Sequence, residues 1–463
     1  NVAVGDFALY SNTTASSNVA LGGDTLSNNT TGSSNTAVGN DALAVNTTGT
    51  ENTAVGATAL DANTTGNKNS VLGVFALSSN TTGTGNTAMG HGSLFSNTTA
   101  SDNTAVGIDA LNDNTTGTKN VAVGAFALDA NTTANDNTAL GYQALTSNTT
   151  GTANTAVGGT APLGSNTTGS RNTAVGFQAL TSNQTVNNNT AVGYNSLALN
   201  TTGDNNTALG ANSLLANTTA SNNTALGKDC LESNTTGEHN TAVGSDCLES
   251  NTTGADNTAV GSGCLAQNTT AQNNTGVGKA ALNVCTTGEN NTAVGHSAGL
   301  VLQTGSNNTL IGYQAGTNAS PSHMVTGSNV VCLGNNSVTS FTCKVSLTSG
   351  SDERDKADIT DFTKGLDIVN SLRPVTYKWD NRSNYSDDLS VTPDGTHKSS
   401  KVDIGLIAQE VETVVKANGY GSSENDRLLF NKSTDGLYYG ITYERFVPVL
   451  INAIKELSVK NTA

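Results

Sequence analysis

Most of the chain repeats one short pattern of polar, apolar and small residues. The pattern reads Asn-Thr-Ala-Val-Gly, two variable residues, Ala-Leu, two variable residues, Asn-Thr-Thr-Gly and two further variable residues. Its first Asn recurs at every 17th position from Asn1 to Asn308, with one longer step, from Asn154 to Asn172, where Pro162 is inserted. A period of about 20 residues with short Thr- and Val-rich runs between glycines is typical of stacked strand-and-turn coils, one coil per repeat. We expect the extra residue to form a local bulge, and we number the positions of each coil from its first Asn.

The pattern also predicts which side chains fill the coil. Side chains alternate along a strand, so Thr and Val share one face, and we expect the Val column at position four to lie inside. The Leu at position nine predicts a second apolar column. The Asn at position twelve predicts a polar column whose side chains hydrogen-bond from coil to coil. The first members of the three columns are Val4, Leu21 and Val38; Leu9, Leu26 and Leu43; and Asn12, Asn29 and Asn46.

The dimensions of such a stack favour association between chains. Eighteen steps of ~4.8 Å make a rod of roughly 90 Å. A single coil is built mainly from Ala, Val, Leu and Thr, and it encloses only a thin core. Lateral association of several chains is the natural way to cover the remaining apolar face, and it predicts a homo-oligomeric fibre.

The repeat pattern ends before the chain does. The sequence predicts a stem over residues 1–316, an irregular transition over 317–350, and a separate domain over 351–463. Alternating Val375, Tyr377 and Trp379 indicate a strand, with Trp379 expected in the core. Apolar residues three and four apart over 446–457 indicate a terminal helix, which could pack on partner chains or on the core of its own chain. The stripe consists of Phe446, Val449, Leu450, Ala453, Ile454 and Leu457.

Composition and charge narrow the function classes. The 463 residues are 35% hydrophobic and 12% charged, against about 45–50% and 25% in ordinary globular domains, which argues against an ordinary enzyme. No run of 18 apolar residues exists, so we expect no membrane insertion. The net charge is −16, with five basic and 18 acidic residues over 1–343. Because neither part is strongly basic, we expect no nucleic-acid partner.

The candidate metal-binding and catalytic side chains of the stem favour structural roles. Cys230, Cys247 and Cys264 share position eight, where most coils have Ala, so we expect one inward column of small side chains. No Cys or His spacing resembles a zinc site, and we expect no metal and no cofactor. Carboxylates such as Asp41 and Asp109 fit solvated turns better than a glycosidase pair. The Asn-Thr-Thr triplets match the N-glycosylation pattern, but turn and ladder chemistry explains their regularity better.

The repeat resembles two groups of fibrous proteins. Its strands are similar to the Val-Ala-Ile-Gly-like strands in the heads of trimeric autotransporter adhesins, and more similar still to Asn-Thr-Ala-Val-Gly repeats of phage tail fibres. This resemblance covers about two thirds of the chain. It implies a left-handed parallel β-roll assembled as a homotrimer.

The C-terminal region resembles the endosialidase-type intramolecular chaperone, the self-cleaving C-terminal domain of phage tail fibres and tailspikes. Four motifs carry this resemblance in order. They are Ser-Asp-Glu-Arg-Asp-Lys at 351–356, Pro-Val-Thr-Tyr-Lys-Trp at 374–379, Gly-Leu-Ile-Ala-Gln-Glu-Val at 405–411, and Ala-Ile-Lys-Glu-Leu at 453–457. Family members usually continue into a longer coiled coil, whereas this sequence ends at Ala463.

The resemblance implies a self-cleaving site. Ser351 and Lys356 would form a Ser-Lys dyad that cuts the bond between Gly350 and Ser351. A Ser hydroxyl becomes a good nucleophile when a base removes its proton, and a Lys amine can act as that base once desolvation favours its neutral form. The nearby acidic residues would keep the amine protonated, so the folded trimer must separate them from Lys356 or bury the amine. They are Asp352, Glu353 and Asp355. An uncleaved module with an ordinary surface Ser and Lys is the alternative.

Together these observations predict an all-β protein with a homotrimeric parallel β-solenoid or β-roll stem, followed by a small α+β chaperone domain that ends in a helix. The predicted function is host attachment by a virion tail fibre, with a surface glycan or receptor as partner. The chain begins mid-pattern at Asn1, and we expect a missing N-terminal region to join other tail or baseplate proteins. We expect peptidase activity in cis only. The alternatives are a bacterial trimeric surface adhesin, an ice-binding solenoid with Thr arrays, and a polysaccharide depolymerase.

Overall fold

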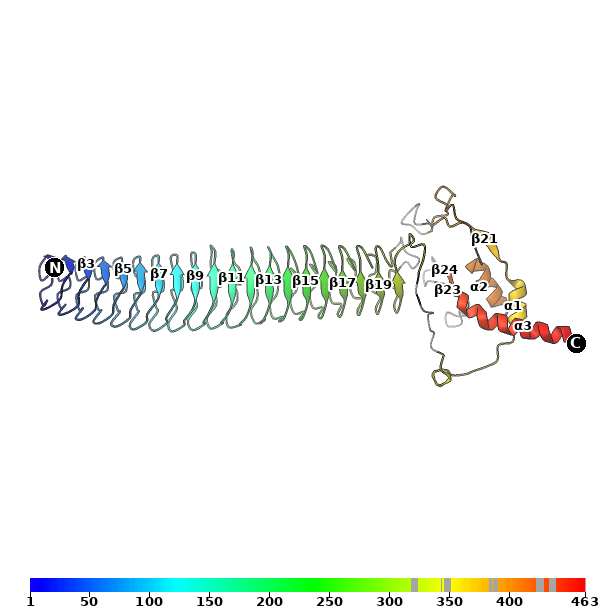
Figure 1. Ribbon diagram of the computed structural model, residues 1–463, viewed down its shortest axis with the longest axis horizontal. Coiled ribbons are helices and arrows are strands. Elements are labelled where there is room, and N and C mark those ends of the chain that lie inside the picture. Colours follow the sequence, from blue (N-terminus) through cyan, green and yellow to red (C-terminus); the bar gives the residue numbers. More distant parts are fainter. Residues whose placement is uncertain are drawn as a thin grey trace. The chain divides into compact units, whose positions relative to one another are not determined.

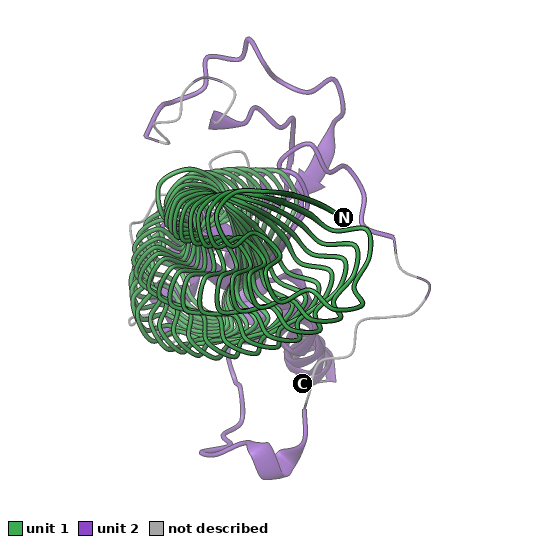
Figure 2. Ribbon diagram, turned by 90° about the vertical axis from the view of Figure 1, so that its left-hand side faces the viewer, with its two compact units in different colours: residues 1–309, 326–331 green, residues 310–325, 332–463 purple. Residues whose placement is uncertain are grey.

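The computed structural model divides the chain into two compact units (Figure 2). The first comprises Asn1–Thr309 and Thr326–Val331, and the second comprises Leu310–Val325 and Cys332–Ala463. The described residues are 1–317, 324–342, 344, 351–382, 385, 390–421, 429–432 and 439–462. In these parts of the chain no helix is both long enough and apolar enough to cross a membrane.

The stem is a stack of coils with one three-residue strand per coil, and its strands line up side by side (Figure 1). They form one sheet of 20 strands. The strands are β1 (Val2–Val4), β2 (Val19–Leu21), β3 (Thr36–Val38), β4 (Thr53–Val55), β5 (Ser70–Leu72), β6 (Thr87–Met89), β7 (Thr104–Val106), β8 (Val121–Val123), β9 (Thr138–Leu140), β10 (Thr155–Val157), β11 (Thr173–Val175), β12 (Thr190–Val192), β13 (Thr207–Leu209), β14 (Thr224–Leu226), β15 (Thr241–Val243), β16 (Thr258–Val260), β17 (Thr275–Val277), β18 (Thr292–Val294), β19 (Thr309–Ile311) and β20 (Val331–Leu333). The predicted parallel solenoid is confirmed.

Equivalent positions of neighbouring coils lie opposite one another. Between β3 and β4, Thr36 pairs with Thr53 in a parallel register, and the other strands follow the same rule. The register survives the insertion, because Thr155 of β10 still pairs with Thr173 of β11. There the Leu145 N–H donates to the Pro162 carbonyl at 3.1 Å, so the extra residue is absorbed in the turn, as predicted.

The predicted side of the strand is wrong. The central residue of β2 to β20 is buried, and it is Ala in most of these strands, as at Ala54, whereas the flanking Thr and Val point outward. Position four is half-buried to exposed along the stem, and Leu72 for example keeps 49% of its surface. The coil explains this arrangement, because the Leu side chains at position nine, such as Leu60, lie inside and are fully buried. The inward strand position therefore holds Ala in most coils, and it takes a larger side chain at Val71 of β5 and Leu310 of β19.

The predicted asparagine ladder is confirmed, and a second one accompanies it. At position twelve the Asn63 Nδ2 donates to the Asn46 Oδ1 at 2.9 Å and to the Gly66 carbonyl at 3.1 Å. At position one the backbone N–H of Asn52 donates to the Asn35 Oδ1 at 3.0 Å. The side chains of both columns are fully buried through most of the stem, so these bonds satisfy polar groups that water cannot reach. These bonds explain why Asn recurs at the start of each Asn-Thr-Thr triplet. In the folded stem such a buried Asn is not accessible to glycosylation.

The turns of each coil use left-handed backbone conformations. The Leu at position nine has positive φ throughout the regular coils, 56° at Leu60. Such a conformation costs about 1–2 kcal/mol, while full burial of a Leu side chain returns about 1.5–3 kcal/mol. The Gly at position five is required for another reason: Gly56 has φ of 139°, and a Cβ there would lie 2.4 Å from the Gly73 carbonyl oxygen.

The second unit contains a small α+β domain. Its elements are η1 (Glu353–Asp355), α1 (Gly365–Ser371), β21 (Val375–Tyr377), β22 (Asp403–Gly405), α2 (Ala408–Ala417), β23 (Phe430–Lys432), β24 (Tyr439–Ile441), η4 (Tyr443–Arg445) and α3 (Phe446–Thr462). The strands form two antiparallel pairs, β21 with β22 and β23 with β24. The helices and the second hairpin share a core of Ile368, Val411, Val415, Leu429, Phe430, Phe446 and Val449. The predicted domain and its terminal helix are confirmed.

Helices α1 and α3 pack backbone against backbone. A Cβ at Gly365 would lie 2.3 Å from the Ala453 nitrogen, so only glycine fits at this contact. The Glu456 carboxylate of α3 accepts from the backbone N–H groups of Gly365 and Leu366 at 3.2 and 3.0 Å. It thereby satisfies donors at the start of α1 that have no partner within the helix.

Helix α3 divides its apolar stripe between two environments. Three of its members pack in the domain, and they are Phe446, Val449 and Ala453. Three others keep 46%, 67% and 48% of their surface exposed, and they are Leu450, Ile454 and Leu457. One face of α3 therefore packs in the core of its own chain, and a neighbouring apolar face is exposed.

Trp379 does not lie in the core. Its side chain is 57% exposed, and its ring meets the Tyr377 ring edge-on with centroids 5.3 Å apart. The strand ends at Tyr377, two residues before Trp379, so the alternation that predicted burial no longer applies at that point.

Candidate functional site

A short turn at the start of the C-terminal domain brings Ser351 and Lys356 together. Asp352 caps the helical turn η1 by accepting from the Arg354 N–H at 2.9 Å. The chain leaves this turn at Lys356, which reaches back over its beginning. The Lys356 Nζ lies 2.7 Å from the Ser351 Oγ and 3.2 Å from the Ser351 carbonyl oxygen. A hydroxyl and an amine thus stand at the distance that proton transfer requires.

One acidic neighbour of this pair, Asp352, is held by Arg354. Its guanidinium contacts the Asp352 carboxylate at 3.0 and 2.6 Å, and this interaction lowers the pKa of Asp352. Among the described residues, no carboxylate lies within 4.0 Å of the Lys356 ammonium. The predicted need to keep carboxylates away from Lys356 is thus met for Asp352 by an arginine two residues along the chain. The Asp-x-Arg spacing at a helix start could have indicated this pairing from the sequence.

The surroundings of the pair are open to solvent. Ser351 and Lys356 are both exposed in the single chain. In the single chain the arrangement therefore supplies the geometry for base-assisted attack without the desolvation that a lysine base requires. Gly350, the predicted residue on the other side of the scissile bond, lies outside the described residues.

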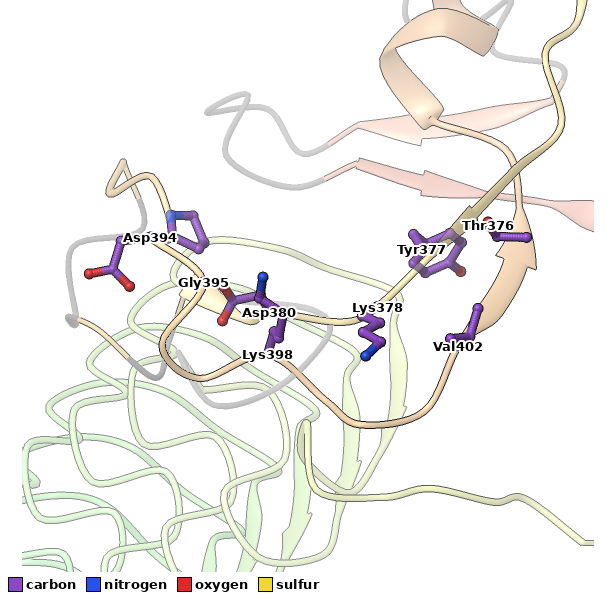
Figure 3. Close-up of a pocket in the computed structure, with 9 residues that line it drawn as sticks. Thr376, Tyr377, Lys378, Asp380, Asp394, Gly395, Lys398 and Val402 are labelled. Carbon is purple, nitrogen blue, oxygen red and sulfur yellow. The ribbon is translucent and has the colours of Figure 1, made fainter.

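A separate depression lies beside the first hairpin of the domain (Figure 3). It has a volume of about 660 Å³, and Ser351 and Lys356 do not line it. Its walls carry both charge signs, with Lys378 and Lys398 facing a region that also contains Asp380 and Asp394. This shallow mixture of charges provides no nucleophile with an adjacent base.

The three stem cysteines lie where the repeat predicts. Cys230, Cys247 and Cys264 are fully buried in one inward column as free thiols. Burial raises the pKa of Cys264 to about 12, which makes this thiol unreactive at neutral pH. In the parts of the chain that the structure describes, no group of three or more His, Cys, Asp or Glu side chains is placed to hold a metal ion.

One buried cysteine interrupts the asparagine ladder. Cys285 occupies position twelve and is fully buried, and its thiol contacts the Gly288 carbonyl at 3.4 Å. The Asn268 side chain of the preceding coil still donates to Asn251, but its own Oδ1 has no hydrogen-bond partner. The missing donor is the side-chain amide that an Asn at position 285 would supply.

Comparison with known families identifies the C-terminal domain. Residues 351–420 match the peptidase S74 family, described as the chaperone of endosialidase. The resemblance predicted from the sequence motifs is thereby confirmed over these residues, which include Ser351 and Lys356. Comparisons with curated proteins and with solved structures found no match. The chain thus joins a repeat-built solenoid to a region that matches the endosialidase-chaperone family.

Proposed function

We propose that the chain is the stem of a trimeric viral tail fibre that attaches to a host surface, and that its C-terminal domain assembles the trimer and then cleaves itself off between Gly350 and Ser351. The observation that carries the cleavage step is the 2.7 Å contact between the Lys356 Nζ and the Ser351 Oγ at the start of the matched family region.

The proposed cleavage proceeds in two steps. Lys356, in its neutral form, takes the hydroxyl proton of Ser351 while the Oγ attacks the carbonyl carbon of Gly350. The peptide C–N bond breaks, the Ser351 nitrogen leaves as an amine with a proton returned from Lys356, and an ester joins Gly350 to the Ser351 oxygen. Water then hydrolyses the ester. The products are a stem that ends at Gly350 and a fragment that comprises residues 351–463.

The exposure of Ser351 and Lys356 in the single chain determines the order of assembly and cleavage. Because water stabilises the protonated amine, Lys356 becomes an effective base once a neighbouring chain covers it. Cleavage therefore follows assembly, and a chain that fails to trimerise keeps its chaperone. The chaperone acts where the stem cannot specify its own register, because near-identical coils allow chains to slip by one whole coil at little cost.

Two exposed apolar surfaces support the trimer. The outward column at position four recurs in coil after coil, so a second copy with the same rise per coil can match it along the whole stem. Leu450, Ile454 and Leu457 on α3 follow the four- and three-residue spacing that packs helices against one another. We assign the first surface to contacts between stems and the second to contacts between chaperone domains.

Mass measurement tests the cleavage. Wild-type protein should yield the fragment of residues 351–463 under denaturing conditions, whereas Ser351→Ala and Lys356→Ala should remain intact and still form trimers. Lys364→Ala, a lysine of the same domain that pairs with Asp367, is the matched control and should cleave normally. Persistent cleavage in Ser351→Ala would refute the mechanism.

Truncation tests the assembly. Residues 1–350 expressed without the remainder should misassemble into species of mixed mass, while the full chain gives homogeneous trimers by sedimentation. A truncated stem that refolds into uniform trimers as efficiently as the full chain would contradict the chaperone role.

One observation favours ice binding as a second candidate function. Position fourteen carries Thr in seventeen coils from Thr14 to Thr304, the coil with the insertion carries the equivalent Thr168, and all eighteen side chains are exposed. A straight column of hydroxyls about 4.8 Å apart is a regular template for ordered water. Thermal hysteresis of the purified full-length protein tests this candidate, since a tail fibre has no reason to depress the freezing point.

A further inference from the structure

The aromatic residues of the stem are confined to one edge of the coils. Residues 1–317 contain nine Phe and Tyr residues, and all nine occupy positions six, seven or ten, just after the strand. They are Phe7, Tyr10, Phe75, Phe95, Phe126, Tyr142, Phe177, Tyr194 and Tyr313. Position six is exposed where it is aromatic, with 52% exposure at Tyr142 and 54% at Tyr194. This edge therefore presents to solvent aromatic rings that the folding of the stem does not require.

The rings are densest in coils eight to twelve. Phe126 meets Tyr142 edge-on with centroids 6.3 Å apart, and Phe177 stacks on Tyr194 at 5.4 Å with an angle of 11° between the rings. From Phe126 to Tyr194 the edge spans four coil steps, or about 19 Å. This length suits a short linear polymer better than a single small molecule.

The one insertion in the stem opens a gap in the middle of these rings. Gly159 occupies position six in the coil between those of Tyr142 and Phe177, and a Cβ placed there would meet nothing within 4 Å. The next two residues, Thr160 and Ala161, have φ of 58° and 52°, so the inserted turn is locally strained. The two flanking rings belong to coils about 9.6 Å apart, which leaves room for one ring-sized group between them.

The polar groups beside the rings of coils nine to twelve are neutral. At position seven, coils nine, eleven and twelve carry Gln143, Gln178 and Asn195, where other coils often carry Asp. The Asn195 Oδ1 and the Thr181 Oγ1 of the same edge are two of the few buried polar atoms in the described chain without a hydrogen-bond partner. Residues 137–205 contain one acidic residue, Asp204, and one basic residue, Arg171, and both lie just before a strand, at positions sixteen and eighteen. A charged ligand would find no counter-ion on this edge in coils nine to twelve, and in coil eight the half-buried Asp129 carboxylate at position ten is occupied by the Thr146 hydroxyl, which donates to it at 2.6 Å.

We propose that the edge formed by Phe126, Tyr142, Phe177, Tyr194 and the amides of Gln143 and Gln178 binds a neutral oligosaccharide, with one sugar ring in the gap at Gly159. Aromatic faces contact the apolar C–H surface of a sugar, and neutral amides exchange hydrogen bonds with its hydroxyls. A second copy of this chain fits less well, because contacts between identical stems use features that recur in every coil, and these rings do not recur. The proposal rests on the attachment function proposed above and identifies the class of surface molecule that the fibre would bind.

The experiment uses full-length protein on an array of bacterial surface glycans, both neutral and acidic. We expect binding to neutral glycans, and we expect Tyr142→Ala and Phe177→Ala each to weaken it at least roughly tenfold. Gly159→Leu should abolish it by filling the gap, while its melting temperature and sedimentation stay unchanged. Tyr10→Ala removes an exposed ring outside coils eight to twelve and should bind normally.

Three results would overturn the proposal: no binding to neutral glycans, binding that survives all three substitutions, or a change of oligomeric mass in Tyr142→Ala that shows the rings to be a contact between chains. Adsorption of labelled protein to a panel of bacteria distinguishes failure of the proposed glycan site from failure of the attachment function. If Tyr142→Ala and Phe177→Ala adsorb like the wild type, attachment stands and the site is elsewhere. If the wild type adsorbs to no strain, the attachment function itself fails.

Discussion

Replacing Asn148 by alanine removes one rung from the middle of the position-twelve ladder. The Asn148 side chain is fully buried and takes part in three hydrogen bonds. Its Nδ2 donates to the Asn131 Oδ1 at 3.1 Å and to the Gly151 carbonyl at 3.0 Å, and its Oδ1 accepts from the Asn166 Nδ2 at 2.8 Å. The substitution therefore acts on the coils on both sides of the altered residue.

The expected cost follows from the groups left without partners. The Gly151 carbonyl keeps a second donor, the Asn137 Nδ2 at 2.9 Å. The Asn131 Oδ1 and one Asn166 amide proton lose their only partners in this ladder. A buried polar group without a partner costs about 1–3 kcal/mol, so the two together destabilise these coils by about 2–6 kcal/mol. The small cavity left by the amide adds to this cost.

Native-state hydrogen exchange is the suitable assay, since it reports local opening of the coils without requiring the whole stem to refold. Amides around residues 131–166 should lose protection by the amount calculated, while amides near β2 should not change. Thr150→Ala alters an exposed residue of the same coil and should stay within about 0.5 kcal/mol of the wild type. A loss below about 1 kcal/mol in Asn148→Ala would mean that the ladder bonds contribute little.

Cys285→Asn should supply the missing donor to the Asn268 Oδ1 but leave its own Oδ1 without one, because the next coil carries the buried Leu302 at position twelve, so the local stability should stay within about 1 kcal/mol of the wild type in the same exchange experiment; a larger change in either direction would contradict the ladder model. Gly365→Ala should destabilise the C-terminal domain by about 1–3 kcal/mol in urea unfolding because its Cβ collides with the backbone of α3, whereas Gly440→Ala, which meets nothing within 4 Å, should not. Burial raises the pKa of Asp129, so its folded form favours the proton: its contribution to stability is fully present below its unfolded pKa and is lost as the pH rises through the folded pKa. Asp129→Asn should therefore stabilise the stem at pH 7 and have no effect at pH 3 in thermal melts, and equal effects at both pH values would refute this.

The sequence predicted the repeat, its register and its polar interior because these follow from periodicity. A residue that returns once in every coil must stack, and an Asn that returns must find its neighbour. Cys230, Cys247 and Cys264 were placed correctly for the same reason. Periodicity does not say which face of a three-residue strand points inward. That choice depends on the width of the coil, which places Ala54 inside in preference to Val55. The width is set by the turns that close the coil, and periodicity does not describe these turns.

The C-terminal domain shows a different limit. Spacing predicted the terminal helix, but it could not divide the stripe, because Val449 meets the core and Ile454 does not. The pairing of Ser351 with Lys356 came from the family motif, and the structure adds the capped turn that produces it. The Glu456 carboxylate at the start of α1 joins residues far apart in the chain, a contact that no local pattern encodes.

The parallel register has a consequence for how such stems change over generations. The recurring bonds between coils link each position to one fixed position of the neighbouring coil, so excision or duplication of one complete repeat unit recreates the same bonds at the new junction. Unequal crossing-over between the nearly identical gene segments could thus lengthen or shorten the fibre in increments of ~4.8 Å without any new side chain having to be selected. The length of the fibre would therefore vary only by whole repeat units. The aromatic edge of coils eight to twelve would keep its structure, but its distance from either end of the stem would change as units are gained or lost beside it.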